Sequence, residues 1–268
     1  MIRPGARSRL IPILRELWAH RELGATLALR DLQLRYRQTL FGLGWAVLQP
    51  LLAMLAFSWV FGQVAGIPSD GLPYPVFVLA GLSLWVYLSG AVGAAADSLV
   101  EHRDLVTKIW FPRLLAPGAA VLALGIDLVV AVSLIVPVMA IYGVEPPAQA
   151  VTLPFWMLGG VIMAAGAGFW LSAANVLYRD VRYALAFLLQ LWLFVSPIVF
   201  PSSLVDGVWR YVFSLNPVAG LVDGIRWALL DGPAPGPELA VSLAALTMIL
   251  VGGVLFFARV ERSFADRI

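Results

Sequence analysis

Residues 114–142 have the sequence LLAPGAAVLALGIDLVVAVSLIVPVMAIY, in which a single charged residue, Asp127, lies among apolar side chains. A helix needs about 20 mostly apolar residues to cross a hydrocarbon core of about 30 Å. The stretch exceeds that length and predicts a membrane-spanning helix. A core helix of a soluble protein can have the same composition, so the rest of the chain must decide.

Five other stretches share this character. In chain order the six predicted spans are 43–61, 76–96, 114–142, 155–178, 184–200 and 239–257. The chain of 268 residues is 61% hydrophobic and 13% charged, whereas soluble domains carry about 25% charge. Six such segments predict an all-α integral membrane protein without a second globular domain.

The basic residues are distributed asymmetrically between the connections. Except for Arg210 and Arg226, every lysine and arginine precedes the first span, follows the last, or lies in the second or fourth connection. Basic residues near helix ends are retained on the cytoplasmic side. Both termini are therefore predicted to be cytoplasmic.

The N-terminal segment, residues 1–42, is predicted to form an amphipathic helix at the membrane interface and not a cleavable signal. It is rich in arginine, and apolar residues recur at helical spacing: Leu10, Ile13, Leu14, Leu17 and Trp18. Two interpretations stay open. The helix is either a plain anchor attracted to anionic lipid or an anchor that also supports a cytoplasmic partner.

The second connection, residues 98–113, has charged and apolar residues at helical spacing and ends at Pro112. It is predicted to be a short cytoplasmic helix. Such a helix either docks onto a soluble protein or is merely a solvated connection. The residues Glu101, Asp104 and Lys108 share one predicted side.

The fifth connection, residues 201–238, is too long for a turn and too apolar for a solvated loop. Asn216 and Pro217 indicate a turn between two short helices within 202–230. Neither helix can cross a bilayer. They are predicted to dip into it from the outer side or to lie on it, and Pro197 and Pro201 are typical of an interrupted helix before them.

Several chemistries have no candidate residues. The chain has no phosphate-binding loop, and Lys108 is its single lysine. It has no cysteine, and its histidines, His20 and His102, lie outside the spans, so neither a catalytic nor a metal site is predicted. Asp127 inside a span costs roughly 2.5–3.5 kcal/mol on insertion scales, and a proton-coupled carrier would use such a residue.

Taken together, these segments resemble the permease subunits of type-2 ABC transporters that export O-antigen, capsule or teichoic-acid chains. The resemblance begins with LALRDLQLRYRQTLFGLGWAVLQPL (27–51) and RDLVTKIWFPRLLAP (103–117). It continues through NVLYRDV (175–181), SPIVF (196–200), LNPVAGLVDGIRWALL (215–230) and VERSFADRI (260–268). The family usually has more lysine in the second segment, where this chain has arginine.

The resemblance implies a half-transporter in the bacterial inner membrane. Two copies would pair, and two separate ATPase subunits would bind ATP and Mg²⁺, so that the chain itself needs no cofactor. The implied cargo is a polysaccharide on an undecaprenyl-type lipid diphosphate, and no nucleic acid partner is expected.

The resemblance also assigns candidate roles. The ATPase-coupling candidates are Glu101, Arg103, Asp104, Lys108, Phe111, Pro112 and Arg113. The candidates for the lipid-diphosphate entrance are Arg30, Arg35, Tyr36 and Arg37, because arginine forks suit diphosphate. The aromatic candidates for sugar contact in the channel are Phe57, Trp59, Tyr87, Trp192 and Phe194, for which lipid-facing or core packing is equally compatible. The outer-gate candidates are Asn216, Pro217 and Arg226.

Three other functions compete with polysaccharide export. An ABC exporter for a small amphiphile or drug would have the same architecture. A secondary carrier would couple to protons through Asp127 and need no ATPase, but the inverted repeats of such carriers are not evident. An intramembrane enzyme lacks a catalytic base.

Overall fold

The computed structural model describes residues 7–36, 41–42, 44–102, 111–178 and 180–266. These residues form helices and no strands. The helices are α1 (Arg7–Ala19), α2 (Arg21–Tyr36), α3 (Gly44–Phe57), α4 (Tyr74–Glu101), α6 (Leu115–Ala123), α7 (Gly125–Ser133), α8 (Ile135–Tyr142), α9 (Leu153–Leu177), α10 (Val181–Val195), α11 (Val208–Phe213), α12 (Pro217–Leu230) and α13 (Leu239–Val260). A π-helical turn, η1 (Ser58–Val64), extends α3, and 3-10 turns form η2 (Ala148–Thr152), η3 (Ser202–Leu204) and η4 (Glu261–Asp266).

Among the described residues, five helical stretches are long and apolar enough to cross a membrane. They are Gly44–Val64, Tyr74–Glu101, Leu115–Tyr142, Ala148–Leu177 and Leu239–Val260. Each contains most or all of one predicted span, so five of the six predicted spans are confirmed as helices of sufficient length and apolarity.

The remaining predicted span, 184–200, corresponds to α10, a shorter apolar helix of 15 residues. At 1.5 Å per residue α10 is about 22 Å long, less than the core of about 30 Å. The helix ends at Val195, and the next residue, Ser196, has an extended backbone and directly precedes Pro197. A crossing at this position therefore stays a prediction.

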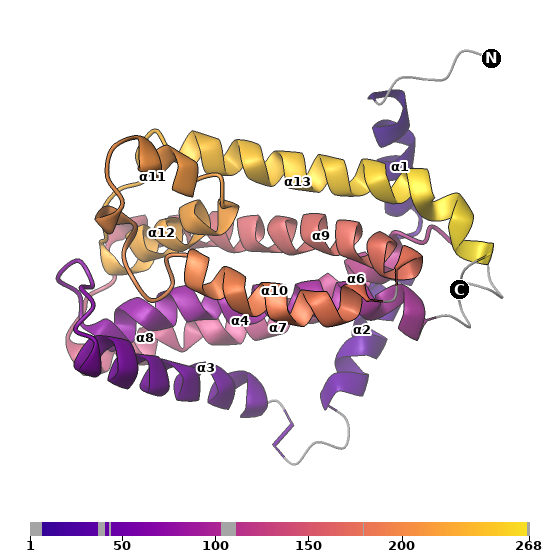
Figure 1. Cartoon of the computed structure of the whole chain (residues 1–268). Coiled ribbons are helices and arrows are strands. Elements are labelled where there is room, and N and C mark those ends of the chain that lie inside the picture. The colour runs from indigo at the N-terminus through magenta and orange to yellow at the C-terminus, as the bar shows by residue number, and fades with distance from the viewer. Residues whose placement is uncertain (1–6, 37–40, 43, 103–110, 179, 267–268) are drawn as a thin grey trace.

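The long helices lie side by side as a bundle (Figure 1). The α4 helix packs against α3, α6, α7, α9, α10 and α12. Its side chains from Val76 to Trp85 are all nearly inaccessible. Because α4 is enclosed by other helices, the surface that faces lipid or a second protein comes mainly from its neighbours.

Small residues let α9 approach helices on two sides. A Cβ atom on Gly166 would lie 2.9 Å from the backbone of Leu250 in α13. One on Gly168 would lie 2.6 Å from the Cβ of Ala95 in α4. The small-residue positions of this span therefore serve helix packing, as such residues commonly do in membrane proteins.

The third predicted span is interrupted twice. The α6, α7 and α8 helices follow one another and meet at Leu124 and Leu134. Pro137 has no backbone N–H to donate to Ser133, the last residue of α7, which accounts for the second interruption. Asp127 lies in the first turn of α7.

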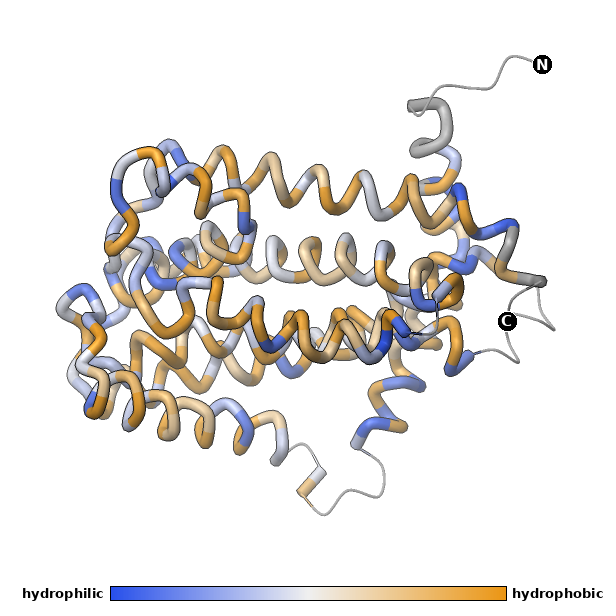
Figure 2. The backbone as a smooth tube through the Cα atoms, viewed as in Figure 1, coloured by the Kyte–Doolittle hydropathy of each residue, from blue (hydrophilic) through white to orange (hydrophobic). Residues whose placement is uncertain are grey.

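The two ends of the bundle differ in charge. The α1 and α2 helices and the end of α13 lie at one end, here called the basic end, which carries Arg15, Arg21, Arg30, Arg113 and Arg259 (Figure 1). The opposite end, here called the distal end, carries α11, α12 and residues 65–73 (Figure 1). Hydrophobic residues cover the helices between the two ends (Figure 2).

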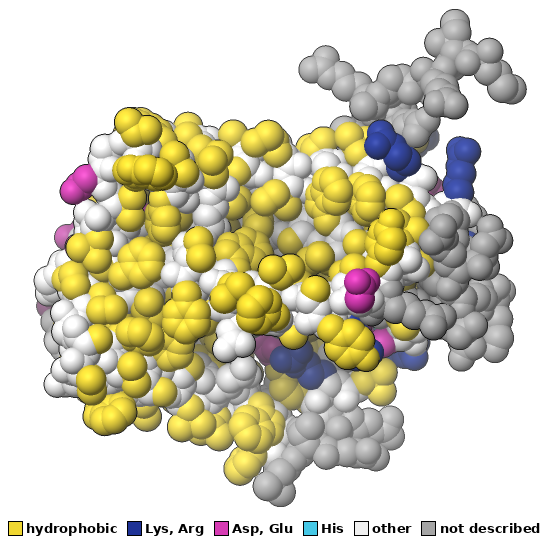
Figure 3. All heavy atoms as spheres, viewed as in Figure 1, with side chains coloured by type: hydrophobic (Ala, Val, Ile, Leu, Met, Phe, Trp, Pro, Cys, Tyr) yellow, Lys and Arg dark blue, Asp and Glu magenta, His cyan; other side chains and the backbone are white. Residues whose placement is uncertain are grey.

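The space-filling view shows the same division. On the face in view, arginine side chains gather toward the basic end, while hydrophobic side chains cover the length of the bundle (Figure 3). Many of these hydrophobic side chains are large and exposed, which is the surface expected of helices in contact with lipid.

Candidate functional site

A pocket of about 300 Å³ lies near the basic end between α2, α4 and the junction of α6 with α7. We call it the α2–α4 pocket. Apolar side chains including Leu34, Ala120 and Leu124 line part of it. Its polar lining consists of Asp31, Arg35, Ser98, Glu101 and His102.

Arg35 and Tyr36 connect α2 to the acid of the third predicted span. Nη2 of Arg35 lies 3.2 Å from Oδ2 of Asp127, and the Tyr36 hydroxyl donates a hydrogen bond to Oδ1. Burial, and then the bond to the carboxylate, raise the pKa of Tyr36 to about 12. Asp127 therefore has two partners on α2, which accounts for its presence in an apolar segment.

His102 and Asp31 form a second link between α4 and α2. Nε2 of His102 lies 3.2 Å from Oδ1 of Asp31, and Nδ1 lies 2.8 Å from the carbonyl oxygen of Ser98. The hydrogen bond to Asp31 raises the pKa of His102, although burial opposes the rise. This side chain was not among the predicted site residues, because nothing in the sequence indicates its partner.

The four predicted entrance residues have different surroundings. Arg35 lines the α2–α4 pocket, and Tyr36 binds the same carboxylate from beside it. Arg30 is exposed on α2, and Arg37 lies outside the described residues. The structure thus brings Arg35 and Tyr36 to the carboxylate of Asp127, which was not among the predicted entrance residues.

The predicted coupling residues begin at the end of α4. Glu101 is exposed there. Arg103, Asp104 and Lys108 lie outside the described residues.

The rest of the coupling set packs within the chain. Phe111 and Pro112 are buried, and Phe111 belongs to an apolar cluster with Phe257. Nη1 of Arg113 donates to the carbonyl oxygen of Glu261, 2.7 Å away. Burial raises the pKa of the Glu261 carboxyl. This end of the segment is thus fixed to the C-terminal region.

Two of the predicted channel aromatics are held inside the bundle. Tyr87 is 1% exposed, and its hydroxyl faces the carbonyl oxygen of Val121 at 3.4 Å. Nε1 of Trp192 donates to Oδ1 of Asn216 at 3.0 Å, and the Trp192 ring meets Trp85 edge-on. Both positions are set by contacts within one chain.

The other three aromatics are more accessible. Trp59 is 66% exposed and Phe194 is 50% exposed. Phe57 is half-buried and its ring packs beside that of Phe61. Trp59 and Phe194 therefore present a ring to a ligand, to lipid or to a second protein, and Phe57, which is half-buried like Trp192, does so in part.

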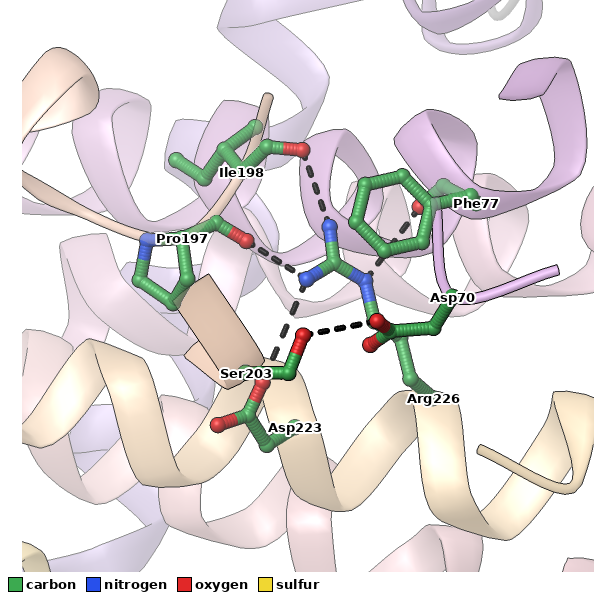
Figure 4. Close-up of polar contacts among 7 residues, drawn as sticks. All are labelled: Asp70, Phe77, Pro197, Ile198, Ser203, Asp223 and Arg226. Atoms are coloured by element: carbon green, nitrogen blue, oxygen red, sulfur yellow. Dashed lines mark hydrogen bonds and ion pairs between the residues drawn. The ribbon is translucent and has the colours of Figure 1, made fainter. Parts of the chain in front are cut away.

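Arg226 occupies the centre of the distal end. It is 4% exposed, and its guanidinium donates to the carbonyl oxygens of Pro197 at 2.6 Å, Ile198 at 2.9 Å and Phe77 at 3.4 Å (Figure 4). The guanidinium carbon lies 3.5 Å from the centre of the Phe77 ring. One side chain of α12 thereby joins the interrupted segment after α10 to the first turn of α4.

Asn216 and Pro217, the other predicted gate residues, form the start of α12. Oδ1 of Asn216 accepts from the backbone N–H of Val218, and Nδ2 donates to Oγ of Ser196. Pro217 occupies the first helical position, where its missing N–H costs nothing. The turn predicted between two short helices is thus present, between α11 and α12.

Ion pairs surround this junction. Arg210 of α11 contacts Glu238 at 2.6 Å, and Asp223 lies 3.9 Å from Arg226. Ser203 donates to Asp70, which has a left-handed backbone conformation (Figure 4). These contacts join α11 to the residue before α13 and η3 to residues 65–73, whereas the pair of Asp223 and Arg226 lies within α12.

The motif at 175–181 and the adjacent Arg182 connect three helices. Nδ2 of Asn175 donates to the carbonyl oxygen of Ala96 and to Oδ1 of Asp97. Nε of Arg182 lies 3.4 Å from Oδ2 of the same aspartate. Asp180 is exposed before α10, and Arg179 lies outside the described residues.

The bundle and its charge asymmetry define a multi-pass membrane protein. The chain belongs to the ABC-2 type transporter family, which it matches over residues 23–230. It is 30% identical to the O-antigen export system permease protein RfbA of Myxococcus xanthus, over 97% of this chain and 100% of that protein.

Two further relatives have related names. The RfbA protein of Klebsiella pneumoniae, also an O-antigen export system permease, is 23% identical over 88% of this chain and 91% of its own length. The polysialic acid transport protein KpsM of Escherichia coli is 23% identical over 88% of this chain and 92% of its own length.

Proposed function

We propose that this chain is the membrane-spanning permease half of an ATP-driven exporter, which moves a lipid-linked polysaccharide such as O-antigen from the cytoplasm across the inner membrane. The observation that carries the proposal is the similarity to O-antigen and polysialic acid export proteins along nearly the whole chain. A relation confined to one motif would support only a common architecture.

The proposed topology has six crossings, with both termini in the cytoplasm. The α10 helix would make the fifth crossing together with residues 196–200. Retention of basic residues on the cytoplasmic side supports placing the basic end there and the distal end outside. Residues 202–230 would then form the outer gate, with Asn216, Pro217 and Arg226 fixing its helices to the bundle.

ATP and Mg²⁺ would be bound by a separate ATPase subunit. In the active complex two copies of this chain would pair above two such subunits. Residues 98–113 would contact the ATPase, and the interface segment 1–42 would support it from the side, leaving 43–268 as the permease domain. The exposure of Glu101 at the end of α4 fits this contact.

The carrier lipid would enter at the α2–α4 pocket. A diphosphate on an undecaprenyl-type lipid needs cations near the membrane interface, and Arg35 lines that pocket with Arg30 on the same helix. Of the aromatic candidates, the exposed rings of Trp59 and Phe194 are the best placed to contact sugars, whose C–H faces pack on aromatic rings.

The proton-coupled alternative receives little support. It needs Asp127 to load and release protons, but that carboxylate is already bound by Arg35 and Tyr36. The exporter of a small amphiphile has no specific observation in its favour, because the relatives named above export polysaccharides.

Deletion of the gene tests the proposal in cells. Surface polysaccharide is measured by gel and antibody, and lipid-linked glycan is extracted from the membrane and quantified beside it. Export predicts that surface polymer is lost while glycan accumulates inside, and that the wild-type gene restores both. Normal surface polymer without accumulation would contradict the proposal and favour a small-amphiphile cargo.

A further inference from the structure

We propose that Asp127 is the internal counter-anion of Arg35: it holds this arginine at the α2–α4 pocket until the diphosphate of the carrier lipid takes its place. The inference rests on the proposed function, because it assumes a lipid diphosphate as ligand. It adds a positioning residue and a form of regulation to that site.

The geometry places the two charges at different depths. The Asp127 side chain is 11% exposed, whereas that of Arg35 is 42% exposed. Both oxygens of the carboxylate are bound from α2, one by Arg35 and the other by Tyr36. The anion is thus fixed within the bundle, while the guanidinium that neutralises it remains within reach of a ligand.

A diphosphate competes well for this guanidinium. Arginine binds carboxylates and phosphates through the same planar fork, and a diphosphate carries more negative charge than one carboxylate. When Arg35 turns toward the ligand, the Tyr36 hydroxyl remains as a hydrogen-bond donor to Asp127. The carboxylate therefore keeps a partner, which limits the cost of leaving a charge inside an apolar segment.

His102, the other pocket side chain that can carry a positive charge, is also paired with an acid. His102 contacts Asp31, and Glu101 adds another acid to the lining. The described pocket therefore contains its own counter-anions. An anion that enters this pocket must displace a carboxylate of the protein from its cation. This exchange would make the pocket selective for a strongly charged group over weakly charged lipids.

Replacement of Asp127 by asparagine distinguishes displacement of a carboxylate from direct binding of the diphosphate to Arg35. Asparagine has the same shape and still accepts a hydrogen bond from Tyr36, but it does not compete for Arg35. We therefore expect Asp127→Asn to bind a polyprenyl diphosphate several-fold to about tenfold more tightly than wild type. Arg35→Gln should bind more weakly, and Asp127→Asn should have no further effect in that background.

The experiment uses the purified full chain in nanodiscs of phosphatidylcholine, with a fluorescent polyprenyl diphosphate as the probe. Asp127→Glu keeps the charge and should restore an affinity close to that of wild type. Asp97→Asn is the matched control, because Asp97 is also paired with an arginine, Arg182, and this arginine, unlike Arg35, does not line the pocket. Inorganic diphosphate, added as a competitor, should bind Asp127→Asn more tightly than wild type.

The outcomes distinguish this inference from the function on which it rests. A wild-type chain that does not bind the probe would contradict the lipid-diphosphate ligand and, with it, both proposals. The exchange alone would be overturned if Asp127→Asn left the affinity for the probe unchanged or lowered it. It would also be overturned if Asp127→Asn still raised that affinity in the Arg35→Gln background. Equal tightening by Asp97→Asn would show a general charge effect and would also overturn it.

Discussion

Nη1 of Arg226 lies 2.6 Å from the carbonyl oxygen of Pro197, so a buried cation of α12 binds the segment where α10 is interrupted. The next carbonyl, that of Ile198, is bound by Nη2. Residues that leave a helix expose backbone oxygens, which are costly to bury without a donor. Arg226 supplies these donors at the distal end.

We predict that Arg226→Gln lowers the thermal stability of the purified protein and reduces export. Each buried carbonyl left without a donor costs on the order of 1–3 kcal/mol. Arg226→Lys should rescue only partly, since an ammonium group lacks the planar fork that serves adjacent carbonyls. The unfolding temperature and surface polymer are measured, with Arg210→Gln as the more exposed control. Equal stability of wild type and Arg226→Gln would contradict this role.

Gly166→Ala is expected to destabilise the contact between α9 and α13. The added Cβ would lie 2.9 Å from Leu250 backbone atoms, and overpacking of this kind typically costs about 1–3 kcal/mol. The gain in helix propensity, about 1 kcal/mol, should not compensate. Gly93→Ala is the control, because a Cβ on Gly93 has nothing within 4 Å. The expected order of unfolding temperatures is Gly166→Ala, then wild type and Gly93→Ala; a reversed order would refute the close packing.

His102 should make stability depend on pH. Its pKa is raised above the ordinary 6.5 by the hydrogen bond to Asp31, so the folded state binds the proton more tightly than the unfolded state. The resulting stabilisation is fully present below pH 6.5 and is lost as pH rises through the folded-state pKa. We expect the difference in unfolding temperature between wild type and His102→Gln to shrink from pH 6 upward. A difference that does not change with pH would show that the pair is not charged.

The coupling segment offers a test that separates docking from folding. Glu101 is exposed, so Glu101→Lys should leave the unfolding temperature unchanged but reduce co-purification of the ATPase and surface polymer. Phe111→Asp should destabilise the protein instead, because it places a charge in an apolar cluster. If Glu101→Lys retained full ATPase association and export, the contact would have to lie elsewhere.

Hydropathy was sufficient to predict much of the fold. The apolar runs predicted five helices that the structure contains, since length and apolarity are local properties of the sequence. The proline pair Pro197 and Pro201 also predicted an interrupted helix. The same criteria overestimated the length of α10, because apolar residues continue beyond the point where the backbone leaves the helix.

Side-chain partners were not predictable in the same way. Tyr36 and Asp127 are 91 residues apart, and no local pattern indicates that α2 reaches α7. The channel aromatics illustrate the same limit. Tyr87 and Trp59 are both aromatic residues of apolar segments, yet one is buried and the other exposed, because exposure depends on which helices pack against each face.

Transport by the reconstituted complex tests whether this chain exports a lipid-linked polysaccharide. The chain and its ATPase partner are placed in proteoliposomes with lipid-linked glycan, and the glycan that reaches the opposite leaflet is measured with an impermeant enzyme that modifies it. We predict translocation that requires ATP hydrolysis and this chain, and that is reduced by Arg35→Gln. ATP-dependent transport of a small amphiphile, with no movement of lipid-linked glycan, would contradict it.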